Sequence, residues 1–208
     1  MNKYSKKIPA VSESVRFTVG APGQKALAQS RPGIGKSFAD EAPLIQWGEM
    51  NSPLGRLYVA VGPQGLCALD FGRGESEFLK RFDPRARLEK NPKSVERIIA
   101  QLSEYFAGKR SRFDLAVDLS TLTQFQKTVL EVTCRIAPGK VWTYHRVAEA
   151  MRRPRSSRPV GQALARNPVP IVIPCHRVIA SNGALRGYSG GSGLKAKRWL
   201  LQLEGAFE

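Results

Sequence analysis

A cysteine and a histidine stand side by side near the end of the chain, where residues 169–178 read Val-Pro-Ile-Val-Ile-Pro-Cys-His-Arg-Val. A cysteine thiolate is a strong nucleophile, and a neighbouring histidine favours the thiolate form. Residues 171–173 lie between Pro170 and Pro174, a pattern that predicts a short buried strand stopped on both sides. Cys175 would then follow the strand end, where a thiol is accessible. The alternative is that Cys175 only fills the core, as free cysteines often do.

One carboxylate could complete this pair. Glu204 is the only acidic residue between Glu149 and Glu208. It either forms a simple ion pair at a helix end or orients the imidazole of His176. In the second case Cys175, His176 and Glu204 supply a nucleophile, a base and an orienting group. Adjacent cysteine and histidine side chains tend to diverge, so a water molecule would link them. The set alone would also suit a cysteine hydrolase.

The remaining cysteines and histidines do not form a metal site. Cys67, Cys134 and Cys175 are far apart in sequence, and the only histidines are His145 and His176. We therefore expect no metal and no cofactor. A small, odd number of cysteines fits free thiols in a reducing compartment. The first residues lack a continuous apolar segment, so we expect neither a secretory signal nor a membrane anchor, and a cytoplasmic, nucleoid-associated location in a bacterium.

The charge of the chain points to a polyanionic partner. Lysine and arginine number 33 against 17 acidic residues, a net charge of +16. Residues 120–208 contain 14 basic and 4 acidic residues, whereas residues 41–119 are close to neutral, with 12 and 11. A basic excess concentrated in one region is typical of nucleic-acid binding.

Three regions follow from the pattern of apolar residues. Residues 1–43 predict a basic, flexible extension in which 15–19 could form a short strand. Residues 44–119 predict an α+β supporting domain with a hairpin over 54–71, a helix from Asn91-Pro92 to Gly108 and a strand over 113–119. No candidate active site lies there. Residues 120–208 form the third region, and they carry the cysteine and histidine described above.

The third region predicts a helix-turn-helix. A capping box of Thr123 and Gln126 starts a helix that ends at Pro138-Gly139, and a short strand over 140–144 follows. Helices over 146–151 and 158–166 flank an arginine-rich break. The last of these helices presents small residues such as Gly161 and Ala163, which suit close approach to a DNA backbone or a narrow groove better than base readout. The glycine-rich residues 183–193 predict a pocket wall, and a closing helix follows over 194–203.

Several ordered motifs together resemble those of one family, the methylated-DNA:protein-cysteine methyltransferases (O6-alkylguanine-DNA alkyltransferases). The motifs are Ser157-Arg-Pro-Val-Gly161, Arg166-Asn-Pro-Val-Pro170, Pro174-Cys-His-Arg-Val178 and Tyr188-Ser-Gly-Gly191. The resemblance covers about residues 48 to 205 and is strongest over 121–205. It implies an α+β fold, in which a small N-terminal α/β domain of ribonuclease H-like type precedes a winged-helix domain that binds DNA and holds the active site.

The resemblance also implies the chemistry of the site. Cys175 would attack the alkyl carbon on O6 of a flipped guanine, or on O4 of thymine, with His176 as the water-linked base and Glu204 holding its imidazole. Tyr144 would crowd the target phosphate and help to neutralise the departing guanine. Because a thioether is a poor leaving group, the alkyl group would stay on Cys175, and the protein would act once.

The remaining roles concern DNA. Arg158 would insert into the duplex in place of the extruded nucleotide. The other residues implied at the DNA or in the guanine pocket are Gly161, Ala163, Arg166, Asn167, Val178, Tyr188 and Ser189. Within this set, Asn167 would tie the groove helix to the active-site strand, and Tyr188 and Ser189 would line the pocket. The backbone carbonyls of Cys175 and Val178 would recognise the exocyclic amine.

Pro159 departs from the family pattern, in which many relatives have alanine, and it could restrict the approach of Arg158. We expect a monomer whose partner is double-stranded DNA containing alkylated guanine. A non-catalytic alkylguanine sensor is the main alternative, although relatives of that kind lack the reactive cysteine. A winged-helix regulator that prefers a defined operator is a third interpretation.

Overall fold

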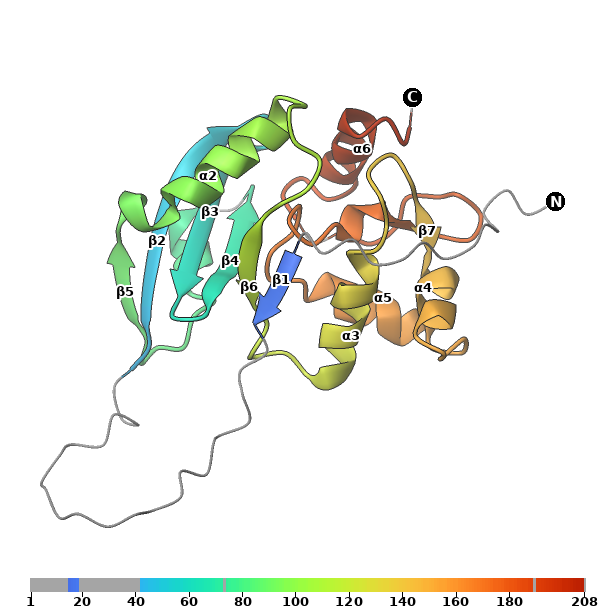
Figure 1. Cartoon of the computed structure of the whole chain (residues 1–208), viewed down its shortest axis with the longest axis horizontal. Helices are drawn as coiled ribbons and strands as arrows, with labels where there is room; N and C mark the ends of the chain where they lie inside the picture. Colours follow the sequence, from blue (N-terminus) through green and yellow to red (C-terminus); the bar gives the residue numbers. More distant parts are fainter. Residues whose placement is uncertain (1–14, 19–41, 73, 189, 208) are drawn as a thin grey trace, which may run out of the picture.

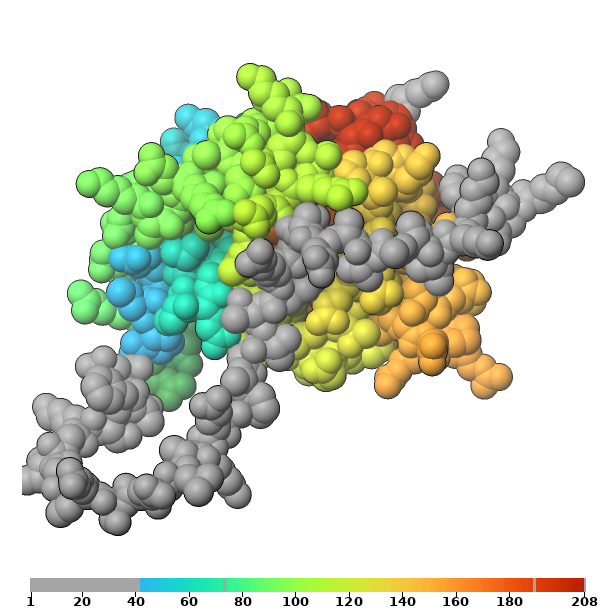
Figure 2. Space-filling model, in the orientation of Figure 1, coloured from blue at the N-terminus to red at the C-terminus, as the bar shows by residue number. Residues whose placement is uncertain are grey.

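The computed structural model describes residues 15–18, 42–72, 74–188 and 190–207, and of residues 15–18 it describes the backbone. Figure 1 shows a sheet with a long helix on one face, and beside it a group of shorter helices. On the face shown in Figure 2, the blue-to-green part and the yellow-to-red part lie directly against each other. No helix among the described residues is long and apolar enough to cross a membrane.

The sheet has six strands in the order β1-β6-β4-β3-β2-β5. Strands β2, β3 and β4 are antiparallel neighbours, whereas β5 joins β2, and β1 joins β6, in parallel. The strand bounds are β1 Val15–Thr18, β2 Leu44–Ser52, β3 Gly55–Gly62, β4 Gly65–Phe71, β5 Arg87–Lys90 and β6 Leu115–Asp118. The predicted hairpin and the strand near residue 115 are confirmed. The strand expected over 15–19 is present over 15–18, and Val19 lies outside the described residues.

Helix α2, Pro92–Phe106, covers one face of this sheet and confirms the predicted helix. Proline at its first position costs no hydrogen bond, because the first amides of a helix have no partner within the helix. Its apolar side points to the sheet and buries Val95, Ile98, Leu102 and Tyr105. A short helix α1, Glu75–Leu79, precedes β5.

The turn between β3 and β4 depends on the glycine at position 65. Gly65 has φ +120°, and a Cβ placed there would lie 2.5 Å from the carbonyl oxygen of Ala116 in β6. We expect Gly65→Ala to lower the free energy of unfolding by about 2 kcal/mol more than Gly55→Ala, since overpacking adds to the cost of positive φ. Gly55, at φ +96°, has nothing within 4 Å of its Cβ position and is the matched control. Urea unfolding of both variants measures the difference, and equal losses would contradict the expected clash.

The second part of the molecule contains three packed helices followed by the active-site segment and a closing helix. The bounds are α3 Gln124–Thr133, β7 Trp142–Thr143, α4 Tyr144–Ala150, α5 Ser157–Ala165, β8 Val178–Ile179 and α6 Leu194–Leu203. The capping box is present, with Thr123 and Gln126 bonded in both directions. The predicted helices are therefore present, with α4 and α5 as the two helices of the helix-turn-helix, but the first helix ends at Thr133 and not at Pro138-Gly139.

The strand predicted over residues 171–173 was wrong. These residues form a turn in which Ile171 has φ +76° and the Ile173 amide donates to the Val169 carbonyl at 3.0 Å. Pro170 and Pro174 remove a donor on each side, so too few amides remain for a ladder. A single 3₁₀ turn, η1 (Cys175–Arg177), follows. The predicted burial is correct, because residues 171–173 are at most 3 % exposed.

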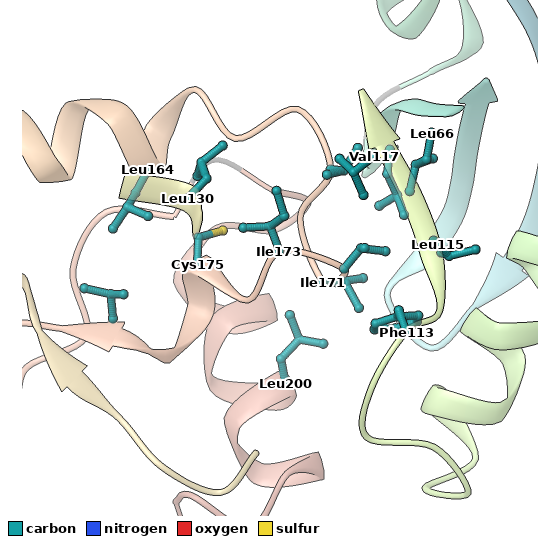
Figure 3. Packing of buried hydrophobic residues seen from close by; sticks show 14 of the residues in the cluster. Leu66, Phe113, Leu115, Val117, Leu130, Leu164, Ile171, Ile173, Cys175 and Leu200 are labelled. Atoms are coloured by element: carbon teal, nitrogen blue, oxygen red, sulfur yellow. The ribbon is translucent and has the colours of Figure 1, made fainter. Parts of the chain in front are cut away.

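This turn fills the space between the two parts. One apolar core is continuous across them. Figure 3 shows Ile171 on the side of Phe113 and Leu115, and Ile173 beside Cys175 and Leu130. The Leu69 amide of β4 also donates to the Pro168 carbonyl at 2.9 Å. The segment that carries the cysteine is therefore packed against the sheet as well as the helices.

Candidate active site

Cys175 opens the 3₁₀ turn and is held by an asparagine at the end of α5. Asn167 Nδ2 donates to Cys175 Sγ at 3.2 Å and to the Ile173 carbonyl at 2.9 Å, and its Oδ1 accepts from the Val169 amide at 3.1 Å. These bonds join α5 to the turn that carries the thiol. Cys175 itself is 7 % exposed, so the accessible thiol expected from the sequence was wrong, because the turn folds back into the core.

The surroundings of this thiol keep it protonated at rest. Burial raises the pKa of the Cys175 thiol, while the hydrogen bond from Asn167 and the charge of Lys197 act in the opposite direction. A buried thiol is a poor nucleophile until a base removes its proton. The site therefore requires a base close to Cys175.

His176 lies next to Cys175 in the same turn and is fully buried. Its Nε2 lies 3.0 Å from Glu204 Oε1, at the end of α6. Arg177 donates two hydrogen bonds to the same carboxylate, from Nε to Oε2 and from Nη2 to Oε1, both at 2.8 Å. The Tyr105 hydroxyl donates to Oε1 as well, at 2.8 Å. The carboxylate is thus surrounded by donors.

These contacts determine which imidazole nitrogen carries the proton. Burial alone would raise the pKa of Glu204, but the hydrogen bonds from His176 and Arg177 hold it well below its usual range, so Glu204 is an anion. Burial lowers the pKa of His176, with Glu204 acting in the opposite direction, so the resting imidazole is neutral. A neutral imidazole facing a carboxylate places its proton on Nε2. Nδ1 is then unprotonated and able to accept a proton, and it has no hydrogen-bond partner among the described residues.

A buried lysine, Lys197, lies close enough to the thiol for its charge to act on Cys175. Lys197 Nζ donates to the Val178 carbonyl at 2.6 Å and to the Arg186 carbonyl at 2.8 Å, and burial lowers its pKa to about 8. The Tyr144 hydroxyl donates to the same Arg186 carbonyl at 2.9 Å. Burial and the nearby Cys175 raise the pKa of Tyr144, so its hydroxyl keeps its proton. Lys197 and Tyr144 together tie the loop before residue 188 to α6 and α4.

Tyr188 lies where the glycine-rich loop meets the sheet. Its ring centroid is 6.4 Å from that of Phe71, and its hydroxyl is buried without a hydrogen-bond partner among the described residues. The loop approaches Phe71 closely at Gly191, where an added Cβ would overlap the ring. Ser189, expected in the pocket, lies outside the described residues.

The residues of α5 that the family resemblance implies at DNA do not share one face of the helix. Arg158 is exposed in the first turn of α5, beside Pro159, and Arg166 is exposed at its end. Gly161 faces Tyr144, whose ring lies 3.6 Å from the position of an added Cβ. Ala163 does not fit its expected role. It is 3 % exposed and belongs to the core, because it shares a face of α5 with Val160 and Leu164.

Sequence reasoning missed three groups in this site, which are Tyr105, Arg177 and Lys197. Tyr105 and Lys197 occupy buried positions of α2 and α6 that look like ordinary core positions. One signal could have indicated that Lys197 is buried: Leu200 and Leu201, three and four positions further on, place it on the apolar face of its helix. Arg177 adjoins His176 in the predicted motif, but its partner, Glu204, lies 27 positions away.

Comparison with known proteins agrees with this site. Residues 45–119 match the model of the 6-O-methylguanine DNA methyltransferase ribonuclease-like domain, and residues 124–206 match that of the DNA binding domain of the same family. A methylated-DNA–protein-cysteine methyltransferase of Methanosarcina barkeri is 42 % identical over 155 residues, which are 74 % of this chain and 94 % of the relative. A relative from Sulfolobus acidocaldarius with the same name is 39 % identical over 162 residues, 78 % of this chain and 94 % of the relative.

A solved structure shows the same fold. The crystal structure of Mycobacterium tuberculosis OGT in complex with DNA superimposes with a TM-score of 0.67 and 32 % identity, over 78 % of this chain and 93 % of that one. The predicted α+β class, with a ribonuclease-like domain before a DNA-binding domain, is confirmed. On these matches the chain belongs to the 6-O-methylguanine DNA methyltransferase family, the methylated-DNA–protein-cysteine methyltransferases.

Proposed function

We propose that this chain repairs O6-alkylated guanine in DNA by moving the alkyl group, once and irreversibly, onto Sγ of Cys175. The observation that carries the proposal is the buried thiol beside an imidazole whose Nδ1 is free of a proton. Family membership supports the substrate, and the exposed Arg158 and Arg166 at the two ends of α5 support binding to the duplex. Repair of O4-alkylated thymine would use the same chemistry.

The transfer requires no cofactor. The thiol proton passes to Nδ1 of His176 through a bridging water, and Glu204 stabilises the imidazolium that forms. The thiolate attacks the alkyl carbon, so the S–C bond forms as the C–O6 bond breaks and the electron pair stays on guanine. Tyr144 donates its hydroxyl proton to the departing guanine, and the proton held by His176 then restores the Tyr144 hydroxyl, so the imidazole is neutral again. The products are guanine and an S-alkylated Cys175.

Arg158 acts before this step. A base inside a duplex cannot reach a buried thiol, so the alkylated guanine must leave the stack. We assign Arg158 to the space that it vacates, since Arg158 is exposed in the first turn of α5. Pro159 fits this turn without loss of a hydrogen bond, because early helix amides lack partners within the helix. Asn167, Tyr188 and the carbonyl of Val178 form the wall against the flipped base.

The test is the site and number of adducts. After incubation with a duplex carrying one O6-methylguanine, we expect mass spectrometry to find one methyl group per protein, on the peptide that contains Cys175. The same duplex with unmodified guanine is the control and should leave every peptide unchanged. Complete binding with an unmodified Cys175 peptide, or a methyl group on Cys67 or Cys134 instead, would refute the proposal.

A further inference from the structure

Helix α2, which packs on the sheet, contributes a side chain to the active site. Tyr105, near the end of α2, is 2 % exposed and donates from its hydroxyl to Glu204 Oε1 at 2.8 Å. Phe113 and Phe106 enclose its ring, with centroids 5.4 and 5.6 Å away. Phe106 in turn contacts Trp199 of α6 at 6.1 Å. The hydroxyl is therefore held in place from both parts of the molecule.

The oxygen that Tyr105 contacts is the one that faces the imidazole. Glu204 Oε1 lies 3.0 Å from His176 Nε2 and accepts from Arg177 Nη2 at 2.8 Å, whereas Oε2 accepts from Arg177 Nε. Each additional donor on Oε1 spreads its negative charge and weakens the attraction of that oxygen for a protonated imidazole. A hydroxyl at Oε1 therefore changes the basicity of His176 without contacting it.

We infer that Tyr105 is a positioning residue for alkyl transfer, which holds Glu204 Oε1 against His176 and limits the basicity that the carboxylate lends to the imidazole. The inference rests on the proposed function, because it assigns Tyr105 to the reaction described there. It gives helix α2 an influence on the base through Glu204.

Other titratable groups surround the same pair. They come from η1, α6, the glycine-rich loop and the end of α3, and they are Cys175, Arg177, Lys197, Tyr188 and Cys134. Burial first, and then the charge of Glu204, raises the pKa of Tyr105 above its usual value, so this hydroxyl remains a donor around neutral pH. Tyr105→Phe therefore removes one neutral donor and no charge.

The experiment compares Tyr105→Phe with Tyr58→Phe. Tyr58 is a buried tyrosine of strand β3, 4 % exposed, in the separate apolar cluster around Trp47 and Phe78. Both variants lose one hydroxyl, and thermal unfolding establishes that each is folded. Single-turnover methyl transfer at saturating DNA is then measured from about pH 5 to about pH 9, a range that includes the ordinary pKa of histidine.

With the Tyr105 hydroxyl gone, Oε1 attracts the imidazolium more strongly, so the pKa of His176 rises and the imidazole stays protonated, and unable to accept the thiol proton, to higher pH. We expect the midpoint of the rising limb of the rate profile to move up by about half a pH unit, the size of one weak hydrogen bond. Tyr58→Phe should leave the midpoint and the DNA affinity unchanged. The inference would be overturned if the Tyr105→Phe profile coincided with the wild-type profile. It would also be overturned if Tyr58→Phe shifted the midpoint by the same amount as Tyr105→Phe.

A second readout does not depend on DNA. The chain contains two histidines, and His145 is half exposed on α4, so ¹⁵N-histidine spectra give two resolvable imidazoles. In Tyr105→Phe we expect the pKa of His176 to rise, and the signals of His145 serve as the internal reference. An unchanged His176 pKa would overturn the inference. If the wild-type protein fails to methylate Cys175, the proposed function fails, while this titration still tests the contact of Tyr105 with the base.

Discussion

Cys175→Ala will abolish methyl transfer and leave binding to lesion-containing DNA intact. Among the described residues of the site, the thiol is the nucleophile beside His176, which takes its proton, so we expect no slower route through a neighbour. Removing Sγ also frees Asn167 Nδ2 from one contact, but its bond to the Ile173 carbonyl remains. We therefore expect no detectable transfer, a DNA affinity within about twofold of wild type, and only a modest loss of stability.

The matched controls are the other two cysteines. Burial raises the pKa of Cys67 to about 12, and that of Cys134 also to about 12, so both thiols stay protonated at neutral pH. Cys67→Ala and Cys134→Ala should each transfer one methyl group at a rate close to that of wild type. Transfer by Cys175→Ala at the wild-type rate would exclude Cys175 as the acceptor. Equal binding of lesion DNA by wild type and Cys175→Ala, without transfer by either, would favour the lesion sensor.

Local signals account for the parts of the fold that the sequence predicted. The capping box of Thr123 and Gln126 marks the start of α3, because it gives backbone amides a hydrogen-bond partner. Pro92 marks the start of α2, because proline has no amide hydrogen that needs a partner. The hairpin around Gly62–Gly65 follows from glycine at the turn. Such signals act within a few residues, so one chain suffices to find them.

Features that depend on distant partners were not predictable in this way. Strand β5, Arg87–Lys90, carries charge on three of its four residues and is defined by its pairing with β2. The turn at Ile171 requires a positive φ in a β-branched residue, which only the packing between the two parts can enforce. Ala163 was assigned to the wrong face of α5, since a small residue suits both a core and a groove.

In the candidate site too, residues marked by local sequence signals were predictable and their distant partners were not. Cys175 and His176 stand together in the sequence, and the scarcity of acidic residues singled out Glu204. The partners of that carboxylate could not be found, because Tyr105 lies 99 positions away and on the apolar face of another helix. A buried polar network is visible only when its members are assembled, although each member costs free energy if left unpaired.

Glu204→Gln is the second change with a large expected effect, because it removes the charge that both His176 and Arg177 face. The Arg177 side chain is 6 % exposed, and an uncompensated buried guanidinium costs about 3 kcal/mol. An amide cannot stabilise an imidazolium as a carboxylate does, and its NH₂ group can force the wrong imidazole tautomer. We expect methyl transfer to slow by a factor on the order of 10³, as in other sites that lose the orienting carboxylate.

The loss of stability should itself depend on pH. The folded-state pKa of Glu204 is depressed, so its contribution to stability is fully present above the unfolded-state pKa, about 4.3, and is lost as the pH falls further. Urea unfolding at neutral pH should therefore separate wild type from Glu204→Gln by about 3 kcal/mol, and the gap should narrow as the pH falls below about 4. Glu104→Gln, which breaks an exposed pair with Arg110, is the control and should cost at most about 1 kcal/mol. A gap that widens in acid, or transfer by Glu204→Gln within about threefold of wild type, would mean that Glu204 is not the anion that holds His176.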